Sequence, residues 1–182
     1  TEKNKYLFAM ADAIEANADS IIAENSKDIA TGNNMGLSKA LLDRLLLNNE
    51  RITAMADGLR EVAELSDPVG RILEERKRPN GLLLTKVSSP IGVIVIIYES
   101  RPNVTADAAS LCFKSGNATI LRGGKEAIHS NRIIAETMVN AAKKLSTEFP
   151  SDAIQVVQPT DRAAIPELLS HINHVDLCIP RG

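Results

Sequence analysis

The chain has 182 residues and a net charge of −2, and no basic segment in it is interleaved with aromatic residues. These properties argue against a nucleic-acid-binding surface. No apolar run approaches the roughly 20 residues that a membrane-spanning helix needs, and no signal peptide is visible. The chain opens directly in a helical pattern at Thr1 and stops at Arg181-Gly182, after an apolar run. We therefore expect one piece of a longer, cytoplasmic polypeptide.

The first part of the chain is predicted to be helical. Residues 6–30 carry apolar side chains at spacings of three and four, which indicates one amphipathic helix. Ser38 is a suitable N-cap for a second helix, and a third covers Asn49–Leu65 and stops at Asp67-Pro68.

A β-hairpin is predicted next. The extended runs Val69–Lys77 and Leu82–Val87 flank the turn residues Pro79-Asn80-Gly81. The hairpin has either a purely structural role or an exposed edge that pairs with another subunit, and we expect a homo-oligomer formed through it. The helices and the hairpin together make up an expected first domain, residues 1–90.

From residue 91 onward, strands alternate with helices. The predicted strands are Val93–Tyr98, Ala118–Leu121, Ile154–Val157 and Val175–Ile179, and the predicted helices between them are Val104–Lys114, Ala127–Leu145 and Asp161–Ser170. This alternation predicts an α/β fold with a doubly wound parallel sheet. We expect residues 91–182 to form a second domain that is incomplete at its C-terminal end.

Polar turns follow the first two predicted strands. The first turn is Glu99-Ser100-Arg101-Pro102-Asn103, and the second is Arg122-Gly123-Gly124-Lys125. Because open α/β sheets bind ligands at the carboxyl ends of their strands, the two turns predict a ligand crevice, and the basic residues favour an anionic ligand. Neither the G-x-G-x-x-G fingerprint nor a P-loop is present.

The residues around these turns resemble a known family. The segment KVSSPIGVIVIIYESRPNVTADAASLCFKSGNATILRGGKEAIHSN (residues 86–131) is similar to the gamma-glutamyl phosphate reductases of the aldehyde dehydrogenase superfamily. The similarity extends to residues 9–25, 36–70 and 172–182. It implies an aldehyde-dehydrogenase-like fold and NADPH-dependent reduction of L-glutamate 5-phosphate to the 5-semialdehyde, with release of phosphate, in proline biosynthesis. It also implies a nucleophilic cysteine in a later domain, beyond this chain.

The resemblance places a cofactor contact on the second turn. The superfamily's ribose-binding motif Lys-Pro-Ser-Glu falls on Arg122, Gly123, Gly124 and Lys125. A glutamate at the last position would accept hydrogen bonds from a ribose 2′-hydroxyl, whereas Lys125 and Arg122 offer two cations to a 2′-phosphate. We therefore expect NADP(H) as the cofactor. The alternative is that both cations are ordinary solvated charges.

The resemblance places further contacts on the first turn and at the end of the chain. The superfamily's Pro-Trp-Asn-Phe-Pro turn falls on residues 98–102, so Tyr98, Glu99 and Ser100 are expected near the cofactor. Ser100 stands where the superfamily has its oxyanion donor, Asn103 is an alternative donor, and Arg101 could pair with the phosphate or carboxylate of the substrate. Alternatively, these residues only cap the following helix. Pro180, Arg181 and Gly182 match a turn that lies beside the cofactor phosphates.

The two cysteines, Cys112 and Cys178, lie in apolar patterns, and we expect both to be buried and without a role in the chemistry. His171 and His174 lack further ligands at metal-binding spacing, so no metal site is expected. Two other functions stay open: the reductase half of a bifunctional pyrroline-5-carboxylate synthase, and, for this chain alone, a non-catalytic nucleotide-binding module.

Overall fold

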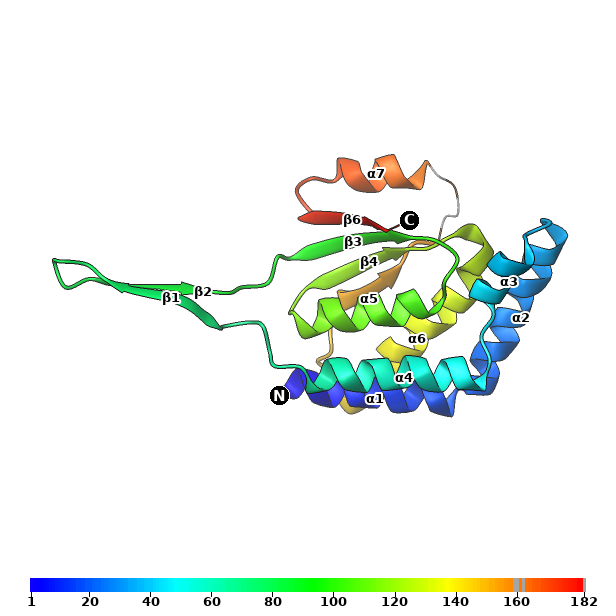
Figure 1. Ribbon diagram of the computed structural model, residues 1–182, viewed down its shortest axis with the longest axis horizontal. Helices are drawn as coiled ribbons and strands as arrows, with labels where there is room; N and C mark the ends of the chain where they lie inside the picture. Colours follow the sequence, from blue (N-terminus) through cyan, green and yellow to red (C-terminus); the bar gives the residue numbers. More distant parts are fainter. Residues whose placement is uncertain (159–160, 162, 182) are drawn as a thin grey trace.

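The computed structural model describes residues 1–158, 161 and 163–181 (Figure 1). Its first part contains four helices, α1 (Glu2–Ala16), α2 (Ala18–Asn34), α3 (Lys39–Leu45) and α4 (Asn49–Glu64). The predicted cap of α3 is confirmed, because the hydroxyl of Ser38 accepts a hydrogen bond from the amide of Leu41. None of the helices described is long and apolar enough to cross a membrane.

The prediction of one helix over residues 6–30 is wrong, because Asn17 interrupts the helical structure and separates α1 from α2. Both the backbone N–H and the side-chain Nδ2 of Asn17 donate to the carbonyl of Ala13, at 3.0 and 2.7 Å. An asparagine side chain that bonds to a nearby backbone carbonyl competes with helix continuation. Apolar residues keep the same spacing on both sides of Asn17, so the pattern does not indicate the break between the two helices.

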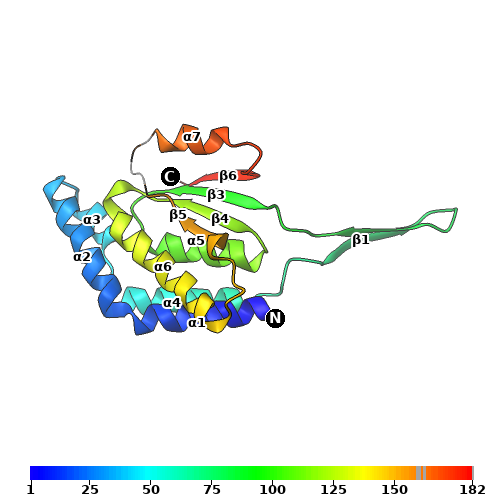
Figure 2. The same cartoon turned by 180° about the vertical axis from the view of Figure 1, so that it is seen from behind.

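The predicted hairpin is confirmed as β1 (Ile72–Lys77) and β2 (Leu83–Val87), an antiparallel pair. Gly81 closes the turn with a φ of +87°, a conformation that favours glycine. Every residue of both strands is exposed. Figures 1 and 2 show why: the hairpin projects away from the rest of the protein.

The remaining elements form the predicted α/β arrangement. They are β3 (Val93–Tyr98), α5 (Asn103–Lys114), β4 (Ala118–Arg122), α6 (Ile128–Leu145), β5 (Ile154–Val156), α7 (Ala164–Ser170) and β6 (Leu177–Arg181), with short 3₁₀ turns at Lys125–Ala127 and Ser151–Ala153. The strands are all parallel, in the order β5-β4-β3-β6. Helices α5 and α6 lie on one side of the sheet and α7 on the other (Figures 1 and 2). The sheet is therefore doubly wound, with its topological switch between β3 and β6.

The core joins the two halves of the chain. The sheet packs on α5 and α6, and these pack on α1 and α4, as Figure 1 shows. An aromatic cluster of Tyr6, Phe113 and Phe149, with ring centroids 5.2–5.9 Å apart, connects α1 with α5 and with the loop after α6. The division into domains at residue 90 stays a prediction, since one hydrophobic cluster contains residues from both sides of it.

A buried polar network holds the start of α6. The carboxylate of Asp28, on α2, accepts hydrogen bonds from the backbone amides of His129 and Ser130, at 3.2 and 2.8 Å, and from the Ser130 hydroxyl at 2.6 Å. Asn25 donates to the Ser130 hydroxyl at 3.0 Å and to the carbonyl of Leu45 at 2.8 Å. A side chain from a distant helix therefore satisfies amides that the first turn of α6 leaves without a partner.

Candidate functional site

The carboxyl ends of β3 and β4 open on a cavity of about 810 Å³, which we call the crevice. Its position follows from the strand register, in which Ile97 pairs with Arg122 and Tyr98 with Arg181, so that the three strands end at the same edge. The residues that line it are Leu41, Tyr98, Glu99, Ser100, Arg122, Gly124, Lys125, Glu126 and Asp161. Sequence reasoning placed six of these nine together and missed Leu41, Glu126 and Asp161.

The two predicted cations both line the crevice but differ in their surroundings. The guanidinium of Arg122 is half-buried and donates to the carbonyl of Gly123 at 3.0 Å and to that of Asp161 at 3.5 Å. Lys125 is exposed and makes no hydrogen bond or ion pair with the described residues. An ammonium group in this position is available to a ligand anion.

Acidic side chains also lie in the crevice. Glu126, one residue past the predicted turn, accepts a hydrogen bond from the hydroxyl of Ser100. Ser100 itself is only 9% exposed, so this bond fixes the carboxylate of Glu126 at the β3 end of the crevice. With Glu99 and Asp161, the crevice is mixed in charge rather than uniformly basic. The two cations are therefore local anion contacts within a site that also offers hydrogen-bond acceptors.

Gly123 forms the base of the second turn and does not line the crevice. A Cβ atom at this position would overlap Nδ2 of Asn131 and lie 3.0 Å from Cε2 of Tyr98. Below the glycine, the Tyr98 hydroxyl and Thr105 Oγ1 are 2.7 Å apart, and Thr105 donates to Asn131 Oδ1 at 3.0 Å. Burial raises the pKa of Tyr98 to about 12, so its phenol stays protonated at neutral pH. The absence of a side chain at Gly123 lets the turn rest directly on this buried group.

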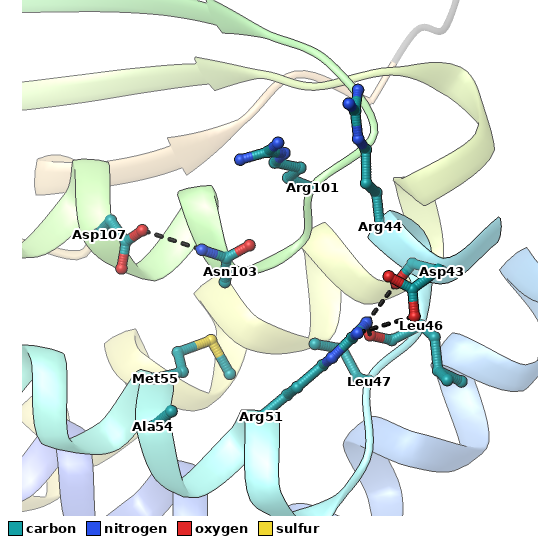
Figure 3. Close-up of a pocket in the computed structure, with 10 residues that line it drawn as sticks. All are labelled: Asp43, Arg44, Leu46, Leu47, Arg51, Ala54, Met55, Arg101, Asn103 and Asp107. Carbon is teal, nitrogen blue, oxygen red and sulfur yellow. Dashed lines mark hydrogen bonds and ion pairs between the residues drawn. The ribbon is translucent and has the colours of Figure 1, made fainter. Parts of the chain in front are cut away.

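A second cavity, of about 330 Å³, lies on the other side of the first turn (Figure 3). It contains two predicted substrate residues, Arg101 and Asn103, which are absent from the crevice. Helices α3 and α4 and the segment between them supply Asp43, Arg44, Leu46, Leu47, Arg51, Ala54 and Met55, and α5 supplies Asp107. None of these eight residues was predicted. Seven of them come from α3, α4 and the segment between them, which meet the first turn only through the tertiary fold, and Asp107 lies on α5, one helical turn past Asn103.

Pro180 and Arg181, two of the predicted residues near the end of the chain, line neither of these two cavities. Pro180 and Arg181 belong to β6 and pair with Ile97 and Tyr98 of β3. Burial raises the pKa of Asp107, and the charge of Arg181 is one of two smaller effects that oppose this rise. The prediction for Gly182 lies outside the described residues.

The two cysteines also lie outside both cavities. Cys112 is buried on α5, and burial raises the pKa of its thiol. Cys178 was expected to be buried, but it is only half-buried, because β6 stands at the edge of the described sheet. Within residues 1–158, 161 and 163–181, no three His, Cys, Asp or Glu side chains gather as a metal site would require.

Comparison with known proteins finds similar chains among oxidoreductases. No protein-family model matches the chain. The chain is 52% identical to a gamma-glutamyl phosphate reductase of Paramagnetospirillum magneticum over 180 residues, which are 99% of this chain and 42% of the relative. It superposes on the crystal structure of gamma-glutamyl phosphate reductase from Thermotoga maritima with a TM-score of 0.95 and 38% identity, covering all of this chain and 43% of that one.

A more distant structure supports the fold alone. An NAD-dependent benzaldehyde dehydrogenase from Corynebacterium glutamicum matches with a TM-score of 0.73 at 17% identity, over all of this chain and 36% of that one. The predicted resemblance and the aldehyde-dehydrogenase-like fold are therefore confirmed: the chain is related to the gamma-glutamyl phosphate reductases along its whole length. It spans less than half the length of these relatives.

Proposed function

We propose that this chain forms the dinucleotide-binding part of an enzyme that reduces L-glutamate 5-phosphate to L-glutamate 5-semialdehyde with NADPH and releases phosphate, in cytoplasmic proline biosynthesis. The relationship to the gamma-glutamyl phosphate reductases supports the reaction. The observation that carries the assignment to this chain is the crevice at the carboxyl edge of the sheet, which both Arg122 and the available ammonium group of Lys125 line.

The residues of the crevice fit a phosphorylated dinucleotide. The volume of about 810 Å³ is within the range that small-ligand sites usually have. Arg122 and Lys125 would hold the 2′-phosphate by charge-assisted hydrogen bonds. Glu126, fixed by Ser100 at the other strand end, offers an acceptor for ligand hydroxyl groups. When bound, the nicotinamide cofactor supplies the hydride.

Of the two predicted oxyanion donors, Asn103 is better placed to act. Ser100 has one hydroxyl proton, and that proton is used in the bond to Glu126. Asn103 donates from Nδ2 to Asp107 at 3.1 Å, but its amide carries a second N–H. We propose that this second N–H faces the substrate oxygen, while Ser100 positions Glu126. Asn103→Ala should then lower kcat more than Ser100→Ala does, and the opposite order would contradict the assignment.

The nucleophile is proposed to lie outside this chain. A thiolate is needed to attack an acyl phosphate, and both thiols here are away from the two cavities. We therefore expect the 182-residue chain alone to show no reductase activity, although nucleotide binding is retained. Turnover by the purified chain comparable to that of the full-length gene product, measured with glutamate 5-semialdehyde, phosphate and NADP, would contradict this.

The cofactor assignment is tested by charge reversal at Lys125. In the full-length gene product, Lys125→Glu should weaken NADPH binding by about 1.5–3 kcal/mol, the usual scale for hydrogen bonds to charged groups. NADH binding should change far less, because NADH carries no 2′-phosphate. Lys143→Glu, an equal charge change on an exposed residue of α6, is the matched control. Equal losses for both nucleotides in a titration would show that Lys125 does not contact the 2′-phosphate.

We further propose that the hairpin binds a second copy of the protein. Six apolar side chains of this two-stranded ribbon are 44–64% exposed: Ile72, Leu73, Leu82, Leu83, Leu84 and Val87. An isolated hairpin is marginally stable in water, and clustered exposed apolar residues mark interaction surfaces. Leu73→Asp combined with Leu84→Asp should reduce the particle mass measured by light scattering, while Lys77→Gln should not. An unchanged mass for the double variant would refute this interface.

A further inference from the structure

We propose that the second cavity holds the amino-acid end of the substrate, with Arg44 and Arg101 binding its α-carboxylate and Asp107 its α-ammonium group. This inference rests on the proposed function, since it assumes an acidic amino-acid acyl phosphate as the substrate. It assigns a ligand to residues that the dinucleotide crevice leaves unused.

The first argument is position. The turn after β3 separates the two cavities: Glu99 and Ser100 line the crevice, whereas Arg101 and Asn103 line the second cavity. Because consecutive Cα atoms are only about 3.8 Å apart, the two cavities adjoin along this turn. A substrate whose reacting carbon lies at the turn can extend into the second cavity while the cofactor occupies the crevice.

The second argument is the pair of available guanidinium groups. Arg44 and Arg101 are exposed, and neither guanidinium group forms a hydrogen bond or ion pair within the described part of the chain. Arg51, the third arginine of the cavity, is instead bound to the carboxylate of Asp43 at 2.9 Å. Figure 3 shows Arg44 and Arg101 on the same side of the cavity, away from the Arg51–Asp43 pair. Guanidinium groups of this kind suit a carboxylate, which they can bind through two parallel hydrogen bonds.

The third argument is the carboxylate across the cavity. Asp107 is half-buried on α5, faces Gly58 of α4, and accepts a hydrogen bond at Oδ2 from Asn103. Its Oδ1 accepts no hydrogen bond from the described residues, and no cation lies within ion-pair distance of it there. Burial raises the pKa of Asp107, against smaller opposing effects of Asn103 and Arg181. An α-ammonium group would give Oδ1 a donor and would bring a positive charge within ion-pair distance.

The fourth argument is the apolar part of the cavity lining, which suits the aliphatic chain of an amino acid. Leu47, Ala54 and Met55 form an apolar part of the lining, of which Leu47 and Met55 are buried. Methylene groups would contact this surface, with the charged groups of the ligand directed to the arginines and to Asp107. The volume of about 330 Å³ is at the lower end of the range for small-molecule sites, as a short amino acid requires.

The test uses the full-length gene product in the oxidative direction, with glutamate 5-semialdehyde, phosphate and NADP. Arg44→Gln and Arg101→Gln should each raise KM for the semialdehyde about tenfold or more, the scale of a lost charge-assisted hydrogen bond. The KM values for phosphate and NADP should stay within about twofold, and Arg101→Lys should recover part of the loss. Arg132→Gln, on the exposed surface of α6, is the matched control. Butanal, which lacks both charged groups, should be oxidised equally by all variants.

Asp107→Asn tests the ammonium contact. The wild-type protein should prefer glutamate 5-semialdehyde over succinate semialdehyde, which lacks the ammonium group, and Asp107→Asn should remove most of this preference. Thermal unfolding shows whether Asp107→Asn is folded. If it is not, Asp107→Glu is measured instead, and this variant should keep the preference for glutamate 5-semialdehyde. A preference unchanged in folded Asp107→Asn would overturn the ammonium assignment.

Two further outcomes would overturn the proposal. One is a raised KM for phosphate with an unchanged KM for the semialdehyde, because the arginines would then hold the phosphate group. The other comes from calorimetric titration with L-glutamate, which does not depend on turnover. If the wild-type protein binds L-glutamate and Arg101→Gln does not, the cavity assignment stands even where the reductase activity is absent. If the wild-type protein is a reductase but Arg101→Gln binds L-glutamate as tightly as the wild type does, the cavity assignment fails while the proposed function stands.

Discussion

Replacing Gly123 by alanine should destabilise the protein by about 1–3 kcal/mol. The new methyl group would overlap Nδ2 of Asn131 and press on the ring of Tyr98, and these two residues are 0% and 4% exposed. Inserting a methyl group into a packed site typically costs 1–3 kcal/mol. Displacing Asn131 would add about 1 kcal/mol for its bond to Thr105, while the lower entropy of the unfolded alanine variant returns about 0.4–1 kcal/mol.

Equilibrium urea unfolding of the full-length gene product measures this change, with Gly124→Ala as the control. A Cβ at Gly124 would meet only the carboxylate end of the half-buried Glu126 side chain, which can move aside by giving up its bond from Ser100, so the cost should be no more than about 1 kcal/mol. The double variant Gly123→Ala/Asn131→Ala should be at least about 1 kcal/mol more stable than the sum of the two single effects predicts, because Asn131→Ala removes the overlapping atom. Equal effects of the two glycine substitutions, or additive effects in the double variant, would refute the packing argument.

Two further predictions concern buried groups. Burial raises the pKa of Asp28, so its contribution to stability is fully present below its unfolded pKa, near 3.8, and is lost as the pH rises through the higher folded pKa. The stability difference between wild type and Asp28→Asn should therefore move in favour of the variant from pH 4 to pH 7, and a shift in the other direction in urea unfolding would contradict this. Cys112→Ser and Cys178→Ser should keep turnover per folded molecule, with a loss of about 1 kcal/mol for the buried Cys112 only; a folded but inactive variant would show that the nucleophile lies in this chain.

The order and type of the elements could be predicted because the apolar runs are strong. The run Val93–Tyr98 coincides with β3, as expected for a strand buried on both faces. Boundaries set by single side chains could not be predicted in the same way. The break at Asn17 depends on local hydrogen bonds to Ala13. The start of β6 at Leu177, two residues later than expected, depends on the pairing of Leu177 with Ile94 of the neighbouring strand.

The candidate site was predictable where it follows from strand ends. Parallel strands deliver Tyr98 and Arg122 to one edge, so the two turns had to lie close together. The second cavity was not predictable, because Arg44 reaches it from a helix more than 50 residues before the turn. Glu126 was within reach of sequence reasoning, since it directly follows the turn. Its place in the crevice depends on the hydrogen bond from Ser100, which lies 26 residues earlier in the chain.

The tether from α2 to the start of α6 has a consequence for the order of folding. Asp28 is 101 and 102 residues from the amides that it holds, and α6 begins immediately after the glycine turn. Contacts of this separation close a long loop and therefore form late. The pairings of β3 with β4 and of β4 with β5 span only 25 and 35 residues, so these three strands should pair first, and the turn should settle only once the N-terminal helices have docked. Hydrogen exchange at the amides of His129 and Ser130 would then report the docking of α2 rather than the strength of α6 itself, and protection at these amides that survives Asp28→Ala would argue against this coupling.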